Sequence, residues 1–191
     1  MATVSYGLKI TEAYHIFDKT ITVYCNAVHY ISDIAIRHYD ELKSLESITG
    51  DDGKVIISAQ QRRQQKMERL IHSTENNDAV YKRFDKEFYK FPSYLRRDAI
   101  NTSIGLMLSY RSQLQNWENG GKHGCRPYLN RNQNTMPCFY RNNTFFDSEE
   151  ANIVSLKLYN GKDWIWETFV IRDCDFIYAY NHMKAWKASA P

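Results

Sequence analysis

The chain has 191 residues, and its 25 Lys/Arg and 22 Asp/Glu give a formal net charge of only +3. This length is enough to bury a real core, as one large domain or two small ones. No apolar run approaches the ~20 residues of a membrane-spanning helix, and the N-terminus lacks a secretory signal pattern, so we expect a cytoplasmic protein with no membrane partner.

Two elements are expected before residue 47. Residues 4–10 alternate apolar and polar side chains, which is typical of a short strand. In residues 14–45, apolar or aromatic side chains recur at alternating steps of three and four, which predicts one long helix. This stripe indicates packing within a small helical bundle, with a coiled-coil seam as the alternative. Residues 47–53 contain an Asp-Asp-Gly turn signal and are expected to form a loop between helices.

The positive charge is concentrated in residues 54–97. This segment contains 11 Lys/Arg and 5 Asp/Glu, a net charge of +6, so the remaining residues together carry −3. Residues 54–73 are predicted to be helical, and positions 62, 66 and 69 share one face of that helix. Such a face either contacts the phosphates of a nucleic acid or is simply solvated. Its basic residues are Arg62, Arg63, Lys66 and Arg69.

A further helix is expected after Pro92. Residues 76–90 are predicted to form a turn and a short helical piece. Pro92 suits the first turn of a helix because proline fixes φ and loses no hydrogen bond there. An apolar stripe then recurs at steps of three or four as far as Trp117. Arg96 and Arg97 lie in the first turns, a position that suits a polyanion; the alternative is a core helix with solvated arginines.

A long polar loop is predicted from residue 120 to about residue 152. Asn-Gly-Gly at 119–121 ends the helix, and no hydrophobic period follows. Basic and aromatic residues are interleaved with asparagines there, an arrangement that either contacts a nucleic acid or is ordinary turn material. The four cysteines of the chain include no CxxC pair, which argues against a zinc ribbon. Cys125, Cys138 and the nearby His123 leave a metal site as an alternative.

A β-hairpin is predicted from Ile153 onward. Apolar and more polar residues alternate up to residue 159, and Asn160-Gly161 is a strong turn signal. The return strand is expected at 164–171, followed by a third strand at 175–180. If the predicted N-terminal strand joins them, the two ends of the chain form one β module and the middle of the chain is a helical insertion.

Three stretches of the chain carry a likeness to a known family. They are the helix with its FPSYLRRDAI start and LSYRSQLQNW end, the polar stretch CRPYLNRNQNTMPCFYRNNTFF, and the strand series NIVSLKLYNGKDWIWETFVI. Together they cover roughly the second half of the chain, which resembles the TnpB-like proteins, also described as OrfB-type insertion-sequence transposases. These proteins are RNA-guided DNA nucleases of transposable elements and are related to type V CRISPR effectors. The first half of the chain matches them only in general layout.

The resemblance implies an α+β fold in which a helical bundle is inserted into a small antiparallel β-barrel-like module. The first part of this wedge module would cover residues 1–12, the helical recognition domain residues 13–119, and the second part of the wedge residues 120–191. The RuvC-like nuclease domain of the family is not recognisable. We therefore expect an N-terminal fragment or a naturally truncated form that is non-catalytic alone and holds no cofactor, since the divalent metal belongs to the nuclease domain.

The partners that the resemblance implies are guide RNA and target DNA, namely the guide–target heteroduplex and a short target-adjacent DNA motif. The residues expected to read that motif are Tyr94, Arg96, Arg97 and Asn101. Those expected to grip the nucleic-acid backbone are Arg62, Arg63, Lys66, Arg69, Arg111, Arg126, Arg131 and Arg141. None is expected to be catalytic or to bind metal.

Two other interpretations remain open at this point. The heptad-like helix at 14–45 would suit a noncatalytic helical interaction or dimerisation module, in which the basic segment is only a solubilising face. A cleavage-dead relative of the nucleases would instead keep guide-RNA binding and act as a repressor by occupying DNA. Salt dependence separates nucleic-acid binding from an apolar helix interface.

Overall fold

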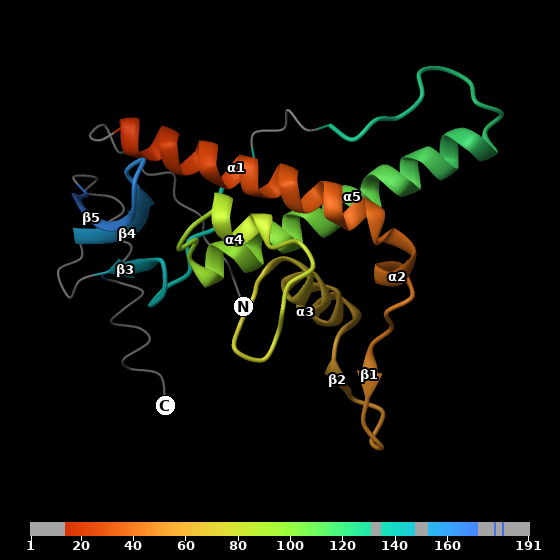
Figure 1. Ribbon diagram of the computed structural model, residues 1–191, viewed down its shortest axis with the longest axis horizontal. Helices are drawn as coiled ribbons and strands as arrows, with labels where there is room; N and C mark the ends of the chain where they lie inside the picture. Colours follow the sequence, from red (N-terminus) through yellow and green to blue (C-terminus); the bar gives the residue numbers. More distant parts are fainter. Residues whose placement is uncertain (1–13, 131–134, 148–152, 172–177, 179–180, 182–191) are drawn as a thin grey trace. The chain divides into compact units, whose positions relative to one another are not determined.

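The computed structural model describes residues 14–130, 135–147, 153–171, 178 and 181 (Figure 1). Helices predominate in these ranges, and the strands form two small antiparallel sheets, so the fold is α+β. The strand expected at 4–10 lies outside the described residues, as does nearly all of the one expected at 175–180. Within the described ranges, no helix is both long and apolar enough to cross a membrane.

The chain divides into two compact units. The end unit comprises Met1–Thr20 and Phe139–Pro191, and the central unit comprises Ile21–Cys138. The boundaries expected from the sequence were at residues 12 and 119. Each unit has its own packed residues.

The long helix expected at 14–45 is present but interrupted. Helix α1 covers Tyr14–Arg37 and helix α2 covers Tyr39–Lys43, with His38 between them at φ −102° and ψ 20°. In the central unit, the apolar stripe of α1 is buried in the core of the chain, with Tyr24 and Ile31 fully buried. Packing within a helical bundle is therefore confirmed, and this stripe leaves little apolar surface for a partner helix.

The segment after α2 differs from its prediction. Strand β1 (Ile48–Thr49) pairs with strand β2 (Val55–Ile57) as an antiparallel hairpin, so the helix expected from residue 54 begins later, and the expected loop at 47–53 supplies strand β1 and the turn. The three β-branched residues of β2 favour a strand, and Gly53 (φ 74°) supplies the left-handed turn residue. Helix α3 (Ala59–Ile71) follows, starting at a capping box of Ser58 and Gln61.

The helix expected to start at Pro92 or Ser93 is confirmed. Helix α5 covers Ser93–Asn119 and follows the short helix α4 (Arg83–Glu87). The side of α5 that carries Leu95, Ala99 and Met107 is fully buried. The Ser103 hydroxyl donates to the backbone oxygen of Val28 at 3.0 Å, which ties α5 to α1 inside the core.

The end unit contains a three-stranded antiparallel sheet. Its strands are β3 (Phe145–Asp147), β4 (Ile153–Tyr159) and β5 (Trp164–Val170), in that order across the sheet. The predicted β4–β5 hairpin is confirmed, because Tyr159 pairs with Trp164 across its turn. Strand β3 lies inside the segment predicted to be a structureless loop. That prediction was wrong because β3 is held by pairing with β4, which no local signal reveals.

The core of the end unit lies on one face of this sheet. The buried residues Val154, Leu158, Phe169 and Ile171 pack together, with Phe17 at the start of α1 beside Phe169 (ring centroids 5.3 Å apart). The backbone N–H of Tyr159 donates to the hydroxyl of Thr20 at 2.8 Å. The first turns of α1 are thus part of the end unit.

Candidate nucleic-acid interface

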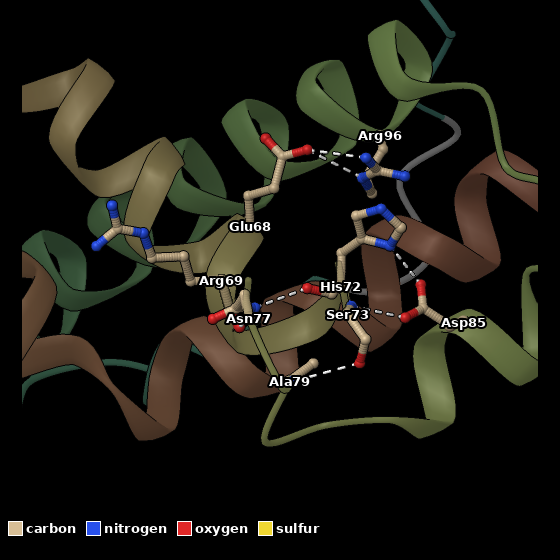
Figure 2. A network of polar contacts seen from close by, with 8 residues as sticks. All are labelled: Glu68, Arg69, His72, Ser73, Asn77, Ala79, Asp85 and Arg96. Carbon is tan, nitrogen blue, oxygen red and sulfur yellow. Dashed lines mark hydrogen bonds and ion pairs between the residues drawn. The ribbon is translucent and has the colours of Figure 1, made fainter. Parts of the chain in front are cut away.

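Arg96, an expected motif-reading residue, lies inside the central unit. Only 8% of the residue is exposed, and its Nε and Nη2 atoms donate to Oε1 of Glu68 at 3.1 and 2.9 Å (Figure 2). Because both bonds are charge-assisted, they are stronger than bonds between neutral groups. Arg96 therefore links α5 to α3 and sets the position of the Glu68 carboxylate.

Arg97, the next residue, lies at the surface. Its side chain is 48% exposed, and its guanidinium lies over the ring of Tyr94 at 5.4 Å from the centroid. Its Nε is 3.8 Å from Oε2 of Glu68, so one carboxylate faces two guanidiniums. The two guanidiniums and one carboxylate carry a net positive charge, and Arg97 is the more exposed of the two guanidiniums.

Amide side chains continue the contact between α3 and α5. The Oδ1 atom of Asn101 accepts from Nε2 of Gln60 at 3.0 Å, and its Nδ2 donates to Oε1 of Gln64 at 3.3 Å. We call this line of polar side chains the α3–α5 seam. It consists of Gln60, Gln64, Glu68, Arg96, Arg97 and Asn101.

The basic residues at the start and middle of α3 are engaged within the chain. Arg62 donates from Nη1 to the backbone oxygen of Glu46 at 2.8 Å. Arg63 donates from Nε to the backbone oxygen of Leu42 at 2.9 Å, beside the C-terminal end of α2. Lys66 forms an ion pair with Glu41. These three side chains fasten α3 to residues 41–46, and a phosphate must compete with those partners.

Arg69 has a different environment. It is exposed, and its guanidinium makes no hydrogen bond or ion pair with the described part of the chain. In Figure 2 no dashed line reaches the guanidinium of Arg69. It lines an open pocket of about 460 Å³, which we call the polar pocket. The lining of the polar pocket is Glu68, Arg69, His72, Thr74, Asn76, Asn77 and Arg96.

A histidine–aspartate pair adjoins the polar pocket. The Nδ1 atom of His72 is 2.7 Å from Oδ1 of Asp85, and the backbone N–H of Ser73 donates to Oδ2 of the same carboxylate at 2.8 Å (Figure 2). Because the carboxylate can only accept, the proton of this bond lies on Nδ1. Nε2, the other ring nitrogen of His72, makes no hydrogen bond within the described residues. It is therefore available to a ligand.

The end of α3 is held by Asn77. Its Nδ2 donates to the backbone oxygens of Arg69 at 2.9 Å and His72 at 2.8 Å. These carbonyls belong to the last turn of the helix, where intrahelical partners are lacking. The Asn77 contacts fix the backbone that carries Arg69 and His72.

A second pocket of about 400 Å³ shares His72 and Arg96 with the polar pocket. Its remaining lining is mostly aromatic, so we call it the aromatic pocket. These other residues are Ser73, Phe84, Asp85, Phe88, Tyr89, Lys90 and Phe91.

The other expected backbone contacts are scattered. The guanidinium of Arg111 lies over the ring of Tyr39 at 4.5 Å, and its buried Nε has no hydrogen-bond partner among the residues that the structure describes. Arg126 is exposed in the central unit, and Arg141 is exposed in the end unit. Arg131 lies outside the described residues. Of the expected residues that the structure describes, it thus brings Arg96, Arg97 and Asn101 together along the seam, and Arg69 and Arg96 together at the polar pocket.

The cysteine-containing segment shows contacts of another kind. The backbone N–H of Cys138 donates to Oδ2 of Asp98 at 2.9 Å, and the Tyr24 hydroxyl donates to the same oxygen at 2.6 Å. Burial, together with the Asp98 carboxylate, raises the pKa of Tyr24 well above its usual range. In the described ranges, no three His, Cys, Asp or Glu side chains come together as a metal site.

Sequence reasoning missed four residues of this region, namely Glu68, His72, Asn77 and Asp85. A signal existed for two of them, because Glu68 and His72 lie four positions apart on one helix and so share a face. Neither Asn77 nor Asp85 belongs to a pattern. Their contacts depend on how the segment after α3 folds back.

Residues 2–160 match the Aq_aa04 family, and the chain belongs to that family. No curated protein and no solved structure matches the chain. Its function must therefore be inferred from the site itself.

Proposed function

We propose that this chain binds nucleic acid through the α3–α5 seam, as part of a TnpB-like RNA-guided DNA endonuclease of a transposable element. Guide RNA, the guide–target heteroduplex and a short target-adjacent DNA motif are the proposed ligands. The observation that carries the proposal is the pair of exposed guanidiniums, Arg69 and Arg97, beside a seam in which Arg96 already occupies the Glu68 carboxylate.

The charge balance of the seam supports a polyanionic ligand. Arg96 and Arg97 face the carboxylate of Glu68, and Arg69 lines the same pocket, which leaves an excess of positive charge on this side of α3 and α5. Neutralisation of phosphates by such side chains supplies much of the affinity for nucleic acids. Since Arg96 is buried, the direct phosphate contacts fall to Arg69 and Arg97.

The amide groups of the seam suit contact with base edges. Asparagine and glutamine can donate and accept together, which matches the edge of adenine. Asn101, Gln60 and Gln64 satisfy one another in the free chain. A base edge would replace these contacts at little cost, because the same numbers of donors and acceptors are paired before and after binding.

The end unit fits the wedge module of this proposal. Its sheet of β3, β4 and β5 is antiparallel and packs on the start of α1. In this proposal the sheet belongs to a barrel-like module, and Arg141 on its β3 side contacts the nucleic-acid backbone.

The proposal is tested by binding to RNA transcribed from the end of the protein's own coding sequence, with unrelated RNA of equal length for comparison. Affinity is measured by fluorescence anisotropy at about 50 and about 200 mM salt. The double variant Arg69→Ala/Arg97→Ala is expected to lower the slope of log affinity against log salt by about 1.4, since each phosphate contact on a single strand contributes about 0.7.

The matched control is Arg37→Ala/Lys86→Ala, which removes the same charge from exposed positions that line neither the seam nor the polar pocket. It should leave the slope close to that of the unmodified chain. If both double variants lowered the slope equally, the effect would come from net charge alone and not from the seam. Absence of binding to either RNA at low salt would overturn the proposal.

A further inference from the structure

The polar and aromatic pockets adjoin each other, because His72 and Arg96 line both of them. Figure 2 shows these two side chains with the polar contacts around them. Both cavities fall in the range of roughly 300–1,000 Å³ that is usual for small-molecule sites. We call the combined site the His72 cleft.

The polar half of the cleft suits an anion. The negative charges nearby are already compensated, because Glu68 accepts from Arg96, and Asp85 accepts from His72 and Ser73. Arg69 has no such partner among the described residues. The uncompensated charge at the polar pocket is therefore positive, and a guanidinium binds a phosphate group through two parallel bonds.

The aromatic half suits a flat ring. Phe84, Phe88 and Phe91 are buried and pack against one another with ring centroids 4.9 to 6.0 Å apart, which makes a rigid floor. Tyr89, by contrast, is 68% exposed, and the Lys90 ammonium lies 5.3 Å from its ring centroid. An exposed tyrosine beside a cation is a stacking surface for a nucleobase.

The backbone at the edge of the cleft is in a sparsely populated conformation. Lys90 has φ 54°, in the left-handed region that non-glycine residues seldom adopt. Such conformations persist only where the surroundings impose them, and they gather at ligand sites. This backbone turn lies between Tyr89, which is exposed, and Phe91, which is buried in the floor.

We propose that the His72 cleft binds one unpaired nucleotide, with its phosphate on Arg69 in the polar pocket and its base on Tyr89 in the aromatic pocket. His72 and Arg96, which line both pockets, would face the sugar, and Nε2 of His72 would accept from its hydroxyl. As a site on a bound strand, the cleft rests on the proposed function. As a site for a free nucleotide it does not.

An unpaired nucleotide is favoured over a base pair because the cleft is concave and one of its ends is aromatic. A base inside a duplex offers only its edge and cannot lie flat on a side chain without leaving the stack. A base in a single strand can lie on an aromatic ring whatever its identity. The cleft is thus expected to accept all four bases with small differences.

The first test uses the whole chain and small ligands, followed by NMR or calorimetric titration. The ligands are a nucleoside 5′-monophosphate, the corresponding nucleoside, inorganic phosphate and a short single-stranded RNA. The monophosphate is expected to bind at least tenfold more tightly than either the nucleoside or inorganic phosphate, since only it reaches both halves of the cleft.

Two variants separate the halves. Arg69→Ala is expected to weaken monophosphate binding about tenfold and to leave the nucleoside unchanged. Tyr89→Ala is expected to weaken both ligands about fivefold. The matched controls are Arg37→Ala and Tyr128→Ala, which remove an exposed guanidinium and an exposed ring elsewhere and should change neither ligand.

The outcomes distinguish the cleft from the proposed function. Binding of RNA that depends on Arg97, with no monophosphate binding and no effect of Tyr89→Ala, would overturn the cleft and leave the seam. Binding of the monophosphate that depends on Arg69, with no RNA binding, would support the cleft as a site for a free nucleotide and overturn the proposed function. Equal effects of Arg69→Ala and Arg37→Ala on the monophosphate would overturn the cleft.

Discussion

The two ends of helix α3 carry the same kind of side chain in different environments. Toward its start, Arg62 and Arg63 donate to backbone oxygens, and Lys66 pairs with Glu41. At its end, Arg69 faces an open pocket without any such partner in the described chain. The first group holds α3 against the segment after α2. At the end of the helix, the charge of Arg69 stays uncompensated by the described residues.

This difference shows that a run of basic residues is not a functional unit by itself. Sequence spacing placed positions 62, 66 and 69 on one face, and all were expected to grip a nucleic-acid backbone. What separates them is whether a carbonyl or carboxylate lies within reach. The same holds on α5, where Arg96 is buried and Arg97 is exposed.

The largest effect on stability is expected for Arg96→Ala. Removal of this guanidinium leaves the Glu68 carboxylate without its main partner at a site where its side chain is only 23% exposed. Loss of one partner of a largely buried ion pair should lower the free energy of unfolding by about 2 kcal/mol, measured by urea denaturation. Arg97→Ala is the matched control and should cost under about 0.5 kcal/mol. Equal costs would show that the two arginines do not differ as described.

A smaller loss is expected for Arg63→Ala. This variant removes the shorter of two bonds to the backbone oxygen of Leu42 at the end of α2 and leaves the one from the N–H of Leu45 at 3.4 Å. The expected cost is about 1 kcal/mol in the free energy of unfolding, with the affinity for RNA nearly unchanged. A loss of RNA affinity at unchanged stability would place Arg63 among the ligand contacts.

For Arg69→Ala we expect a loss of affinity without a loss of stability. Because the guanidinium has no partner in the described residues, the free energy of unfolding should change by less than about 0.5 kcal/mol. Affinity for RNA and for a nucleoside monophosphate should fall. Thermal denaturation and titration of the same preparation check both parts. Marked destabilisation would mean that Arg69 supports the fold.

The smallest effect concerns Glu41 and depends on pH. Hydrogen bonds from Lys66 and His38 hold the pKa of Glu41 below its ordinary value of 4.5. A lowered pKa means that the carboxylate stabilises the fold above pH 4.5 and that this contribution is lost as the pH falls through the lowered value. The difference in melting temperature between the native chain and Glu41→Gln should thus persist from pH 7 to 5.

Below pH 4.5 the same difference should shrink, because protonated Glu41 and glutamine are both neutral. At pH 7 the difference should correspond to about a few tenths of a kcal/mol in the free energy of unfolding, since the Lys66–Glu41 pair is partly exposed. Lys66→Met removes the principal partner and should reduce the pH dependence of the difference. A difference that grows below pH 4.5 would contradict this assignment.

The elements that the sequence predicted well are those with local causes. Pro92 sets the first turn of α5, and Asn160-Gly161 sets the turn between β4 and β5. The stripe of α1 is periodic over many turns and is buried as expected. Each of these signals lies within a few residues of the structure that it determines.

The features that the sequence did not predict depend on distant partners. Strand β2 was assigned to a helix because its short run of β-branched residues directly precedes a helical pattern, and β3 was assigned to a loop because its partner is β4. The α3–α5 seam and the His72 cleft could not be predicted for the same reason, since their partners are distant in the sequence. Glu68 meets Arg96 28 positions later, and His72 meets Asp85 13 positions later.

The Glu68 carboxylate serves its two arginines through different oxygens. Oε1 accepts both bonds from Arg96, while Oε2 faces Arg97 at 3.8 Å. A phosphate that draws Arg97 away thus leaves the Arg96 bonds in place. The joint between α3 and α5 does not depend on the Arg97 contact, because Arg96 holds it through the other oxygen. Occupancy of the interface should therefore leave that joint intact, and the loaded chain should keep the same α3–α5 packing as the free chain.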